Sequence, residues 1–139
     1  PRAKISDNPY DFSFSGVKSA VLNYINSCKM KNIPYVQADI AASFQKAVTD
    51  VLIEHAMHAA RETGMKKFAI AGGVASNGTL REGMRAACER RGIQFYHPSP
   101  VLCTDNAAMI GCAAYYEYLA GTRHGWDLNA IPNLKLGER

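Results

Sequence analysis

The strongest constraint on the fold comes from the second half of the 139-residue sequence, where short apolar runs alternate with helical patterns. The expected strands span residues 67–71 and 93–96, and the expected helices span residues 77–91 and 104–120. Strand, helix, strand and helix at this spacing predict a parallel, right-handed β-α-β unit with a flanking helix. The predicted fold class is therefore α/β.

The first half of the chain predicts one strand and two helices. Residues 11–15 alternate aromatic and small polar side chains, which is typical of a half-buried strand. A helical pattern begins at Gly16 and is interrupted near Pro34. A longer helix is expected from about Val36, with Gly64 as its C-cap, and it would be roughly 40 Å long.

The composition is that of an ordinary globular domain. Apolar residues make up 47% and charged residues 20%, and the net charge of +4 comes from 16 Lys and Arg against 12 Asp and Glu. These values exclude disordered, collagen-like and low-complexity classes, and the length suffices for a core without a disulfide or a metal. The mild positive charge is compatible with an RNA partner, although no run of Lys or Arg stands out.

Cysteine usage and the lengths of the apolar runs favour a cytoplasmic protein. The four cysteines form no C-x-x-C pair, so reduced thiols are expected. The longest apolar stretches are too short to cross a bilayer, and no secretory leader opens the chain. The chain begins at Pro1 without an initiator Met, so we expect either a processed protein or a piece of a longer one.

Candidate ligand-binding residues follow the first predicted strand of the β-α-β unit. Gly72 and Gly73 would let the backbone pass close to a ligand, and Asn77 opens the next helix, whose free amides attract anions. Ligands of open α/β sheets collect at the carboxyl ends of strands. The alternative is a tight turn in which Ser76 or Asn77 caps the helix, because the segment is neither a P-loop nor a G-x-G-x-x-G fingerprint.

Asp105 is a candidate metal ligand at the start of the last predicted helix. Because it follows the strand at 93–96, it would lie at the same sheet edge as the glycine turn. A carboxylate there could hold a metal that neutralises a nucleotide phosphate. The alternative is a charge in the first helical turn that interacts favourably with the helix dipole.

The remaining polar groups are weaker candidates. Ser13, Ser15 and Lys18 could face a phosphate, or they could belong to an amphipathic strand followed by a solvated lysine. His55 and His58 share a helix face but do not form H-E-x-x-H, so packed or half-exposed histidines are favoured over metal ligands. A solvated helix face is expected for Arg81, Glu82, Arg85, Glu89, Arg90 and Arg91. No Ser-His-Asp or Cys-His arrangement can be assigned, so no catalytic residue is predicted.

Three motifs occur in a characteristic order along the chain. They are FSFSGVK at residues 12–18, GGVASNGTLR at 72–81 and TDNAAMI at 104–110, and ASFQ at 42–45 is a further match. Together they resemble the universal tRNA threonylcarbamoyladenosine transferase family, formerly described as O-sialoglycoprotein endopeptidase or glycoprotease. The resemblance extends to about Ala120, and each motif alone would be weak.

The resemblance implies an α/β fold that is the C-terminal lobe of an actin-like (ASKHA, ribonuclease H-like) protein, truncated and helix-rich with a β-α-β core. The lobe would span residues 1–121, and residues 122–139 would form an irregular tail in which Trp126 docks. The family's H-x-x-x-H metal-binding pair belongs to the first lobe and does not occur here. The chain is therefore expected to be a C-terminal fragment that has no transferase activity of its own.

The family's activity is an acyl transfer to tRNA. Threonylcarbamoyl passes from threonylcarbamoyl-adenylate to the exocyclic amine of the adenosine beside the anticodon. The resemblance implies that Asn77, with Gly72 and Gly73, contacts the adenylate or ATP and that Asp105 is a ligand of iron or zinc, with no cofactor held by the fragment itself. It also implies tRNA, a paralogous protein and a small ATPase as partners in the cytoplasm, and no membrane.

Two other functions remain as alternatives. A metalloendopeptidase is the older description of the family, but it would need a metal-bound water and a general base, and no H-E-x-x-H occurs. A plain ATP-binding or kinase-like module of the same superfamily is the second alternative. The TDNAAM sequence at residues 104–109 argues against that module.

The implied sheet has the strand order 3-2-1-4-5, with residues 11–15, 67–71 and 93–96 as its third, fourth and fifth strands. The first strand would be absent, and residues 1–5 would be a stub of the second. A gap would then open in the middle of the sheet, and unpaired strand edges recruit other chains. We therefore expect residues 11–15 to leave this position or to pair with a second molecule, as in a strand-exchanged homodimer.

Overall fold

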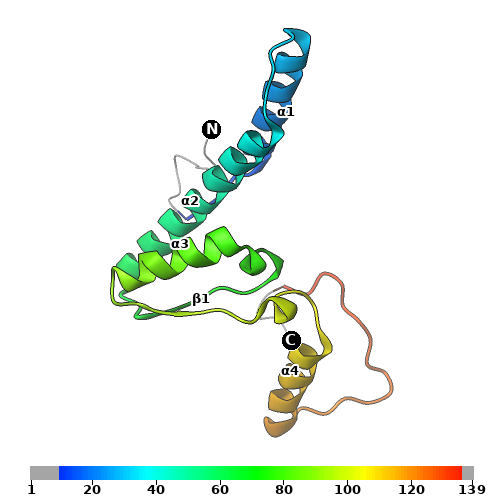
Figure 1. Ribbon diagram of the computed structural model, residues 1–139. Coiled ribbons are helices and arrows are strands. Elements are labelled where there is room, and N and C mark those ends of the chain that lie inside the picture. Colours follow the sequence, from blue (N-terminus) through cyan, green and yellow to red (C-terminus); the bar gives the residue numbers. More distant parts are fainter. Residues whose placement is uncertain (1–9, 136–139) are drawn as a thin grey trace. The chain divides into compact units, whose positions relative to one another are not determined.

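The computed structural model describes residues 10–135, and its helices and strands follow the expected α/β order in the second half of the chain (Figure 1). The helices are α1 (Ser15–Met30), α2 (Gln37–Thr63), α3 (Gly78–Glu89) and α4 (Ala107–Leu119). The strands are β1 (Lys67–Ala69) and β2 (Gln94–Tyr96), and the short 3-10 helices are η1 (Gly73–Ser76) and η2 (Pro100–Leu102). The chain divides into two compact units, one up to Thr104 and one from Asp105, and each is described by itself.

The β-α-β unit expected from the sequence is confirmed in the first unit. Strands β1 and β2 pair in parallel, with Phe68 opposite Phe95 in the register, and α3 lies between them along the chain. Both strands are shorter than expected, although a hydrogen bond from the Ile70 N–H to the Tyr96 carbonyl (3.1 Å) continues the ladder. Among residues 10–135 the sheet has these two strands only.

The core of the first unit lies where α2, α3 and the sheet meet. Its buried members are Met57, Ala60, Leu80, Met84, Ala87, Cys88 and Ile93. The α3 members recur at helical spacing, so one apolar stripe of this helix faces the core. Phe68 and Phe95 pack against the same cluster, with ring centroids 6.5 Å apart. Helix α1 is joined to α2 separately, through the buried pair Val17 and Val51.

Helix ends in the first unit follow the local signals in the sequence. Gly64 is the C-cap of α2 and has a left-handed φ of 66°, as its expected capping role requires. The C-cap of α3 is Arg90, and Gly92, two residues further on, has a φ of 64°. Asn77 is the N-cap of α3 and accepts a hydrogen bond from the Leu80 N–H at 2.9 Å. The predicted Gly64 cap is confirmed, and so is the Asn77 cap that the sequence offered as an alternative.

The strand expected over residues 11–15 is wrong. Helix α1 already begins at Ser15, and the preceding residues are exposed, with only an isolated β-bridge at Phe12. Instead of entering the sheet, the segment packs its aromatic rings on α2, with Phe12 stacked on His55 (4.7 Å) and Tyr10 on His58 (5.4 Å). In an extended segment, residues two apart point to the same side, and on a helix, residues three apart share a face. Tyr10 and Phe12 can therefore both stack on the histidines of α2, and the alternating pattern provides this contact. The expected stub at residues 1–5 lies outside the described residues.

In the second unit, α4 begins later than the sequence suggests. The Asn106 side chain accepts a hydrogen bond from the Met109 N–H at 3.0 Å, which makes Asn106 the N-cap and Ala107 the first helical residue. Asp105 therefore precedes the helix, and its expected place in the first helical turn is wrong.

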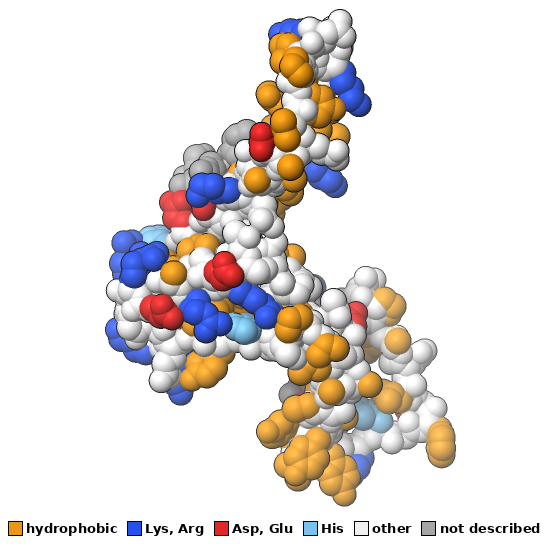
Figure 2. All heavy atoms as spheres, in the orientation of Figure 1, with side chains coloured by type: hydrophobic (Ala, Val, Ile, Leu, Met, Phe, Trp, Pro, Cys, Tyr) orange, Lys and Arg blue, Asp and Glu red, His pale blue; other side chains and the backbone are white. Residues whose placement is uncertain are grey.

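Helix α4 carries large apolar side chains on all its faces, and none of its residues is buried. Figure 2 shows these side chains gathered over α4. The exposed ones are Met109, Ile110, Tyr115, Tyr116, Tyr118 and Leu119. None of the described helices is both long and apolar enough to cross a membrane.

The tail from residue 122 to residue 135 is irregular, as expected, but the predicted docking of Trp126 is wrong because its side chain is fully exposed. The start of the tail is held on α4 by other groups. The Thr122 hydroxyl donates to the Glu117 carboxylate at 3.0 Å, and the Arg123 guanidinium lies 3.9 Å from the centroid of the Tyr118 ring. These polar and cation–π contacts fix the chain just after the helix without using the tryptophan.

Candidate functional site

The glycine turn after β1 is the first part of the candidate site. Gly72 has φ 85°, a conformation that L side chains rarely adopt, and nothing lies within 4 Å of the position a Cβ would take there. Glycine is thus required at this position by the backbone conformation, and the space beside it is open. The turn continues into η1, where the Ser76 hydroxyl donates to the Gly73 carbonyl at 2.6 Å.

Asn77 combines a capping role with a contact to α2. Its Oδ1 accepts from the Leu80 N–H at 2.9 Å, and its Nδ2 donates to Oε1 of Gln45 at 3.0 Å. Gln45 in turn donates from Nε2 to the hydroxyl of Thr79 at 3.0 Å. The capping role that the sequence offered as the alternative is confirmed, and Asn77 is half-buried at the end of a small amide network.

The loops after β1 and β2 meet at one edge of the sheet, as their position after parallel strands predicted. A Cβ on Gly73 would lie 3.9 Å from the Thr104 methyl group, which is ordinary contact between the two loops. This confirms the expectation for the loop after β2 as far as Thr104. Asp105 belongs to the second unit, where it is exposed and immediately precedes the cap residue Asn106.

Arg81 was expected on a solvated helix face, and that prediction is wrong. Its guanidinium donates from Nε to the Ala75 carbonyl in η1 and from Nη2 to the Pro98 carbonyl (2.9 Å) and the Cys103 sulfur (3.1 Å). A planar group with five donors can serve several acceptors at once, so Arg81 joins both loops to α3. The solvated face is confirmed for the other five residues, which are all exposed: Glu82, Arg85, Glu89, Arg90 and Arg91.

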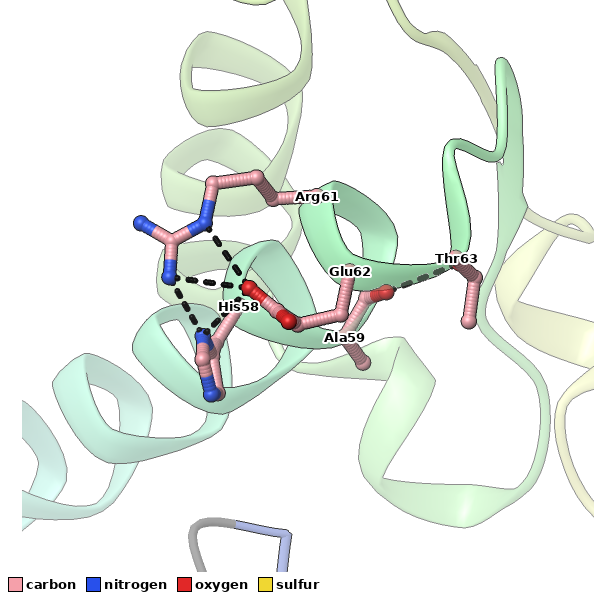
Figure 3. Close-up of polar contacts among 5 residues, drawn as sticks. All are labelled: His58, Ala59, Arg61, Glu62 and Thr63. Carbon is pink, nitrogen blue, oxygen red and sulfur yellow. Dashed lines mark hydrogen bonds and ion pairs between the residues drawn. The ribbon is translucent and has the colours of Figure 1, made fainter.

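The two histidines of α2 are packed side chains, as expected. His55 is buried against Phe12, and its Nδ1 is a buried polar atom without a hydrogen-bond partner among the described residues. His58 Nδ1 lies 2.8 Å from the Arg61 guanidinium and 4.0 Å from the Glu62 carboxylate, and Figure 3 shows the three side chains converging. Each histidine therefore has its own surroundings, and they do not form a joint ligand pair.

Metal-binding chemistry is limited in the described part of the chain. Residues 10–135 contain no group of three or more His, Cys, Asp and Glu side chains that could hold a metal ion. Asp105 alone offers one carboxylate, which suits zinc or iron as a single ligand but does not complete a site. The described residues therefore do not form a metal centre by themselves.

The phosphate-facing role suggested for Ser13, Ser15 and Lys18 stays a prediction. The two serine hydroxyls lie 3.3 Å apart, and Lys18 is exposed in the first turn of α1. All four cysteines are free thiols, and three of them, Cys28, Cys88 and Cys103, are buried. Burial raises the pKa of the Cys88 thiol, so this group stays protonated at neutral pH.

Sequence reasoning missed two residues of this site, Gln45 and Arg81. Gln45 lies 32 residues before Asn77 and Arg81 lies 22 residues before Cys103, so no local spacing signals either contact. The only available signal was that each residue belongs to a motif, ASFQ at 42–45 and GGVASNGTLR at 72–81.

A glycine turn at the carboxyl end of a parallel strand, followed by an asparagine-capped helix, is the arrangement at which proteins of the α/β class commonly bind ligands. The family comparison is more specific. Residues 1–112 match the model of the family described as TsaD, tRNA N6-adenosine threonylcarbamoyltransferase, and the chain belongs to this family.

Curated relatives match the chain along its entire length. It is 58% identical to a tRNA N6-adenosine threonylcarbamoyltransferase of Clostridium beijerinckii, 57% identical to one of Clostridium perfringens and 55% identical to one of Clostridium botulinum. Each alignment covers 100% of this chain and 41% of the relative. The chain thus spans about two-fifths of the length of these relatives.

Proposed function

We propose that this chain acts as part of a tRNA N6-adenosine threonylcarbamoyltransferase. The observation that carries the proposal is the match of the whole chain, at 55–58% identity, to proteins with that name. In this function the threonylcarbamoyl group passes from threonylcarbamoyl-adenylate to the exocyclic amine of the adenosine beside the anticodon. The amine attacks the carbonyl carbon, AMP leaves, and the amine loses a proton.

The tRNA amine is itself the nucleophile, so the reaction requires no nucleophilic side chain from this chain. The proposed task of the described residues is to bind and orient the nucleotide. Gly72 and Gly73 would allow the close approach of the ligand, which agrees with the open space beside Gly72. Asn77 would contact the nucleotide through the part of its amide that the capping bond leaves available.

Asp105 is proposed as one ligand of an iron or zinc ion whose other ligands come from outside the described residues. Its exposure and its position ahead of α4 leave the carboxylate accessible for that role. When bound, such an ion would supply positive charge opposite the phosphate of the adenylate.

We also propose the wider setting implied by the family. The chain would be a lobe of an actin-like fold over residues 1–121 with a tail at 122–139, and it would act in the cytoplasm. Its partners would be tRNA, a paralogous protein and a small ATPase. Residues 11–15 are not in the sheet, which supports the alternative that this segment leaves its expected position. The other alternative, a strand-exchanged homodimer, would be detected by light scattering of the chain in solution.

The test is an activity comparison on the full-length protein. Adenylate-dependent formation of threonylcarbamoyladenosine in tRNA is measured beside proteolysis of a glycoprotein substrate and hydrolysis of ATP alone. We expect tRNA modification, and its loss in Asp105→Ala. Proteolysis or ATP hydrolysis without tRNA modification would contradict the proposal and favour the metalloendopeptidase or the ATP-binding module.

A further inference from the structure

We propose that Gln45 is a positioning residue that holds the Asn77 amide in the orientation in which it meets the nucleotide. The inference rests on the proposed function, in which Asn77 contacts the adenylate or ATP. It adds a residue of α2, far away in the sequence, to the nucleotide-binding turn. The geometry that supports it is the continuous chain of hydrogen bonds from Leu80 through Asn77 and Gln45 to Thr79.

The orientation of the Asn77 amide is determined by one partner on each side. The Leu80 N–H requires an acceptor, which is Oδ1, and Oε1 of Gln45 requires a donor, which is Nδ2. If the amide were flipped, two donors would meet at Leu80 and two acceptors would meet at Gln45. With the capping bond alone, the amide plane could still rotate about the Oδ1 contact, so the bond to Gln45 fixes the direction of the amino group.

Counting the hydrogen-bond donors and acceptors of the Asn77 side chain shows what it retains for a ligand. An asparagine amide has two N–H donors and two acceptor positions on its oxygen. Gln45 takes one donor, and Leu80 takes one acceptor position. One N–H of Nδ2 thus remains, and its direction follows from the other N–H, which points to Gln45. A nucleotide with an acceptor atom in that direction would be recognised by a preset donor.

The surroundings of Gln45 favour a positioning role over a role in packing the core. Its side chain is exposed and does not belong to the core, and the two described hydrogen bonds of this side chain go to Asn77 and Thr79 at the start of α3. The backbone of Gln45 lies within the 27-residue helix α2, whose C-terminal half carries core residues such as Met57 and Ala60. A rigid helix therefore presents the amide, and the loss of an exposed hydrogen bond should cost little stability.

The experiment is a double-mutant cycle on ATP affinity in the full-length protein, measured by titration calorimetry. Gln45→Met keeps the length of the side chain and removes both hydrogen bonds. Asn77→Ser keeps an oxygen that caps α3 but removes the amino group. Thr79→Val removes the anchor of Gln45 with little change in shape, and it serves as a second variant if Gln45→Met fails to fold. Gln37→Met, an exposed glutamine at the start of the same helix, is the matched control.

We expect Gln45→Met to weaken ATP binding about fivefold and Thr79→Val about twofold, as the loss of one neutral hydrogen bond predicts. Because both act through Asn77, neither should have an effect in the Asn77→Ser background. In turnover assays, KM for the adenylate should rise while kcat changes far less. The melting temperatures of Gln45→Met and Thr79→Val should equal that of the unsubstituted protein. The Gln37→Met control should bind ATP as tightly as the unsubstituted protein.

The outcomes separate the inference from the function on which it rests. If Asn77→Ser binds ATP as tightly as the unsubstituted protein, the proposed nucleotide contact at Asn77 is wrong, and the inference falls with it. If Asn77→Ser weakens binding but Gln45→Met does not, only the positioning role is overturned. The positioning role is also overturned if Gln45→Met weakens binding equally in the Asn77→Ser background, because Gln45 would then act independently of Asn77.

Discussion

Arg81 of α3 donates a hydrogen bond of 2.9 Å to the carbonyl oxygen of Pro98, and it thereby ties the loop after β2 to the helix that follows β1. The same guanidinium reaches the Ala75 carbonyl and the Cys103 sulfur. One side chain thus holds both loops at the edge of the sheet where the candidate nucleotide turn lies.

Replacing Arg81 by Met should lower the free energy of unfolding by about 2 kcal/mol, because the backbone acceptors in both loops lose a charged donor. Arg81→Lys should recover only part of this loss, since an ammonium group cannot span acceptors in two loops. Urea denaturation gives the free energies, and hydrogen exchange should show faster exchange at residues 72–76 and 98–103. Arg90→Met, at an exposed arginine of the same segment, is the control and should change stability by less than about 0.5 kcal/mol. Equal losses in both variants would refute a linking role for Arg81.

Asp105→Ala should abolish tRNA modification by the full-length protein while changing the free energy of unfolding by at most about 1 kcal/mol, because the carboxylate is exposed and lies ahead of the helix. Asn106→Ala is the matched contrast. It should cost about 1 kcal/mol through the lost cap of α4 and leave the carboxylate in place. Turnover by Asp105→Ala near that of the unsubstituted protein would leave Asp105 with no role beyond a surface charge.

The four thiols should react with iodoacetamide at very different rates at neutral pH. Cys112 is exposed and should be alkylated first, whereas Cys88 is buried and its raised pKa keeps the nucleophilic thiolate scarce. Mass spectrometry of peptides from a time course gives the order. Cys88 should remain unmodified until the protein unfolds. Early labelling of Cys88 in the folded protein would show that its surroundings open readily.

His55→Phe should leave the free energy of unfolding unchanged or raise it by about 1 kcal/mol. The ring can still stack on Phe12, and the substitution removes the buried Nδ1, which has no hydrogen-bond partner within residues 10–135. His55→Ala should instead lower stability by about 2 kcal/mol because it leaves a cavity beneath Phe12. Chemical denaturation of both variants checks the difference. A destabilised His55→Phe variant would mean that the imidazole makes a polar contact in solution.

The 139-residue chain on its own should retain less than stoichiometric iron or zinc after dialysis, since one carboxylate is too few ligands for a tight transition-metal site. Metal content is read by inductively coupled plasma mass spectrometry. Asp105→Ala serves as the comparison. One metal ion per chain, lost in Asp105→Ala, would show that the chain completes a site without further residues.

Local rules sufficed for much of the fold and failed where contacts join distant segments. Gly64 and Asn77 could be named as caps from the sequence because a cap depends on the few residues around it. The aromatic alternation at residues 11–15 has the period of a strand, but the partner of that face is α2 and not the sheet. The period of the aromatic pattern shows that one side of an extended segment is apolar, but it does not show which surface that side packs on.

In the candidate site, too, some residues follow from local sequence and others from contacts between distant segments. The glycine turn and the asparagine cap follow from local sequence, whereas the amide of Gln45 and the guanidinium of Arg81 reach it across many residues. The arginine was expected in solvent because its neighbours on α3 are charged, and only the positions of Ala75 and Pro98 show why it is not.

The apolar surface of α4 affects how the chain can be studied in solution. Six large hydrophobic side chains of one helix are accessible in the folded state. Dyes such as anilinonaphthalene sulfonate fluoresce on exposed apolar surface, and such a signal is normally taken as a sign of a partly folded protein. This chain would give the same fluorescence signal while its helices and sheet are intact. Dye-based melting curves would therefore begin from a high baseline, and circular dichroism is the sounder measure of whether a variant is folded.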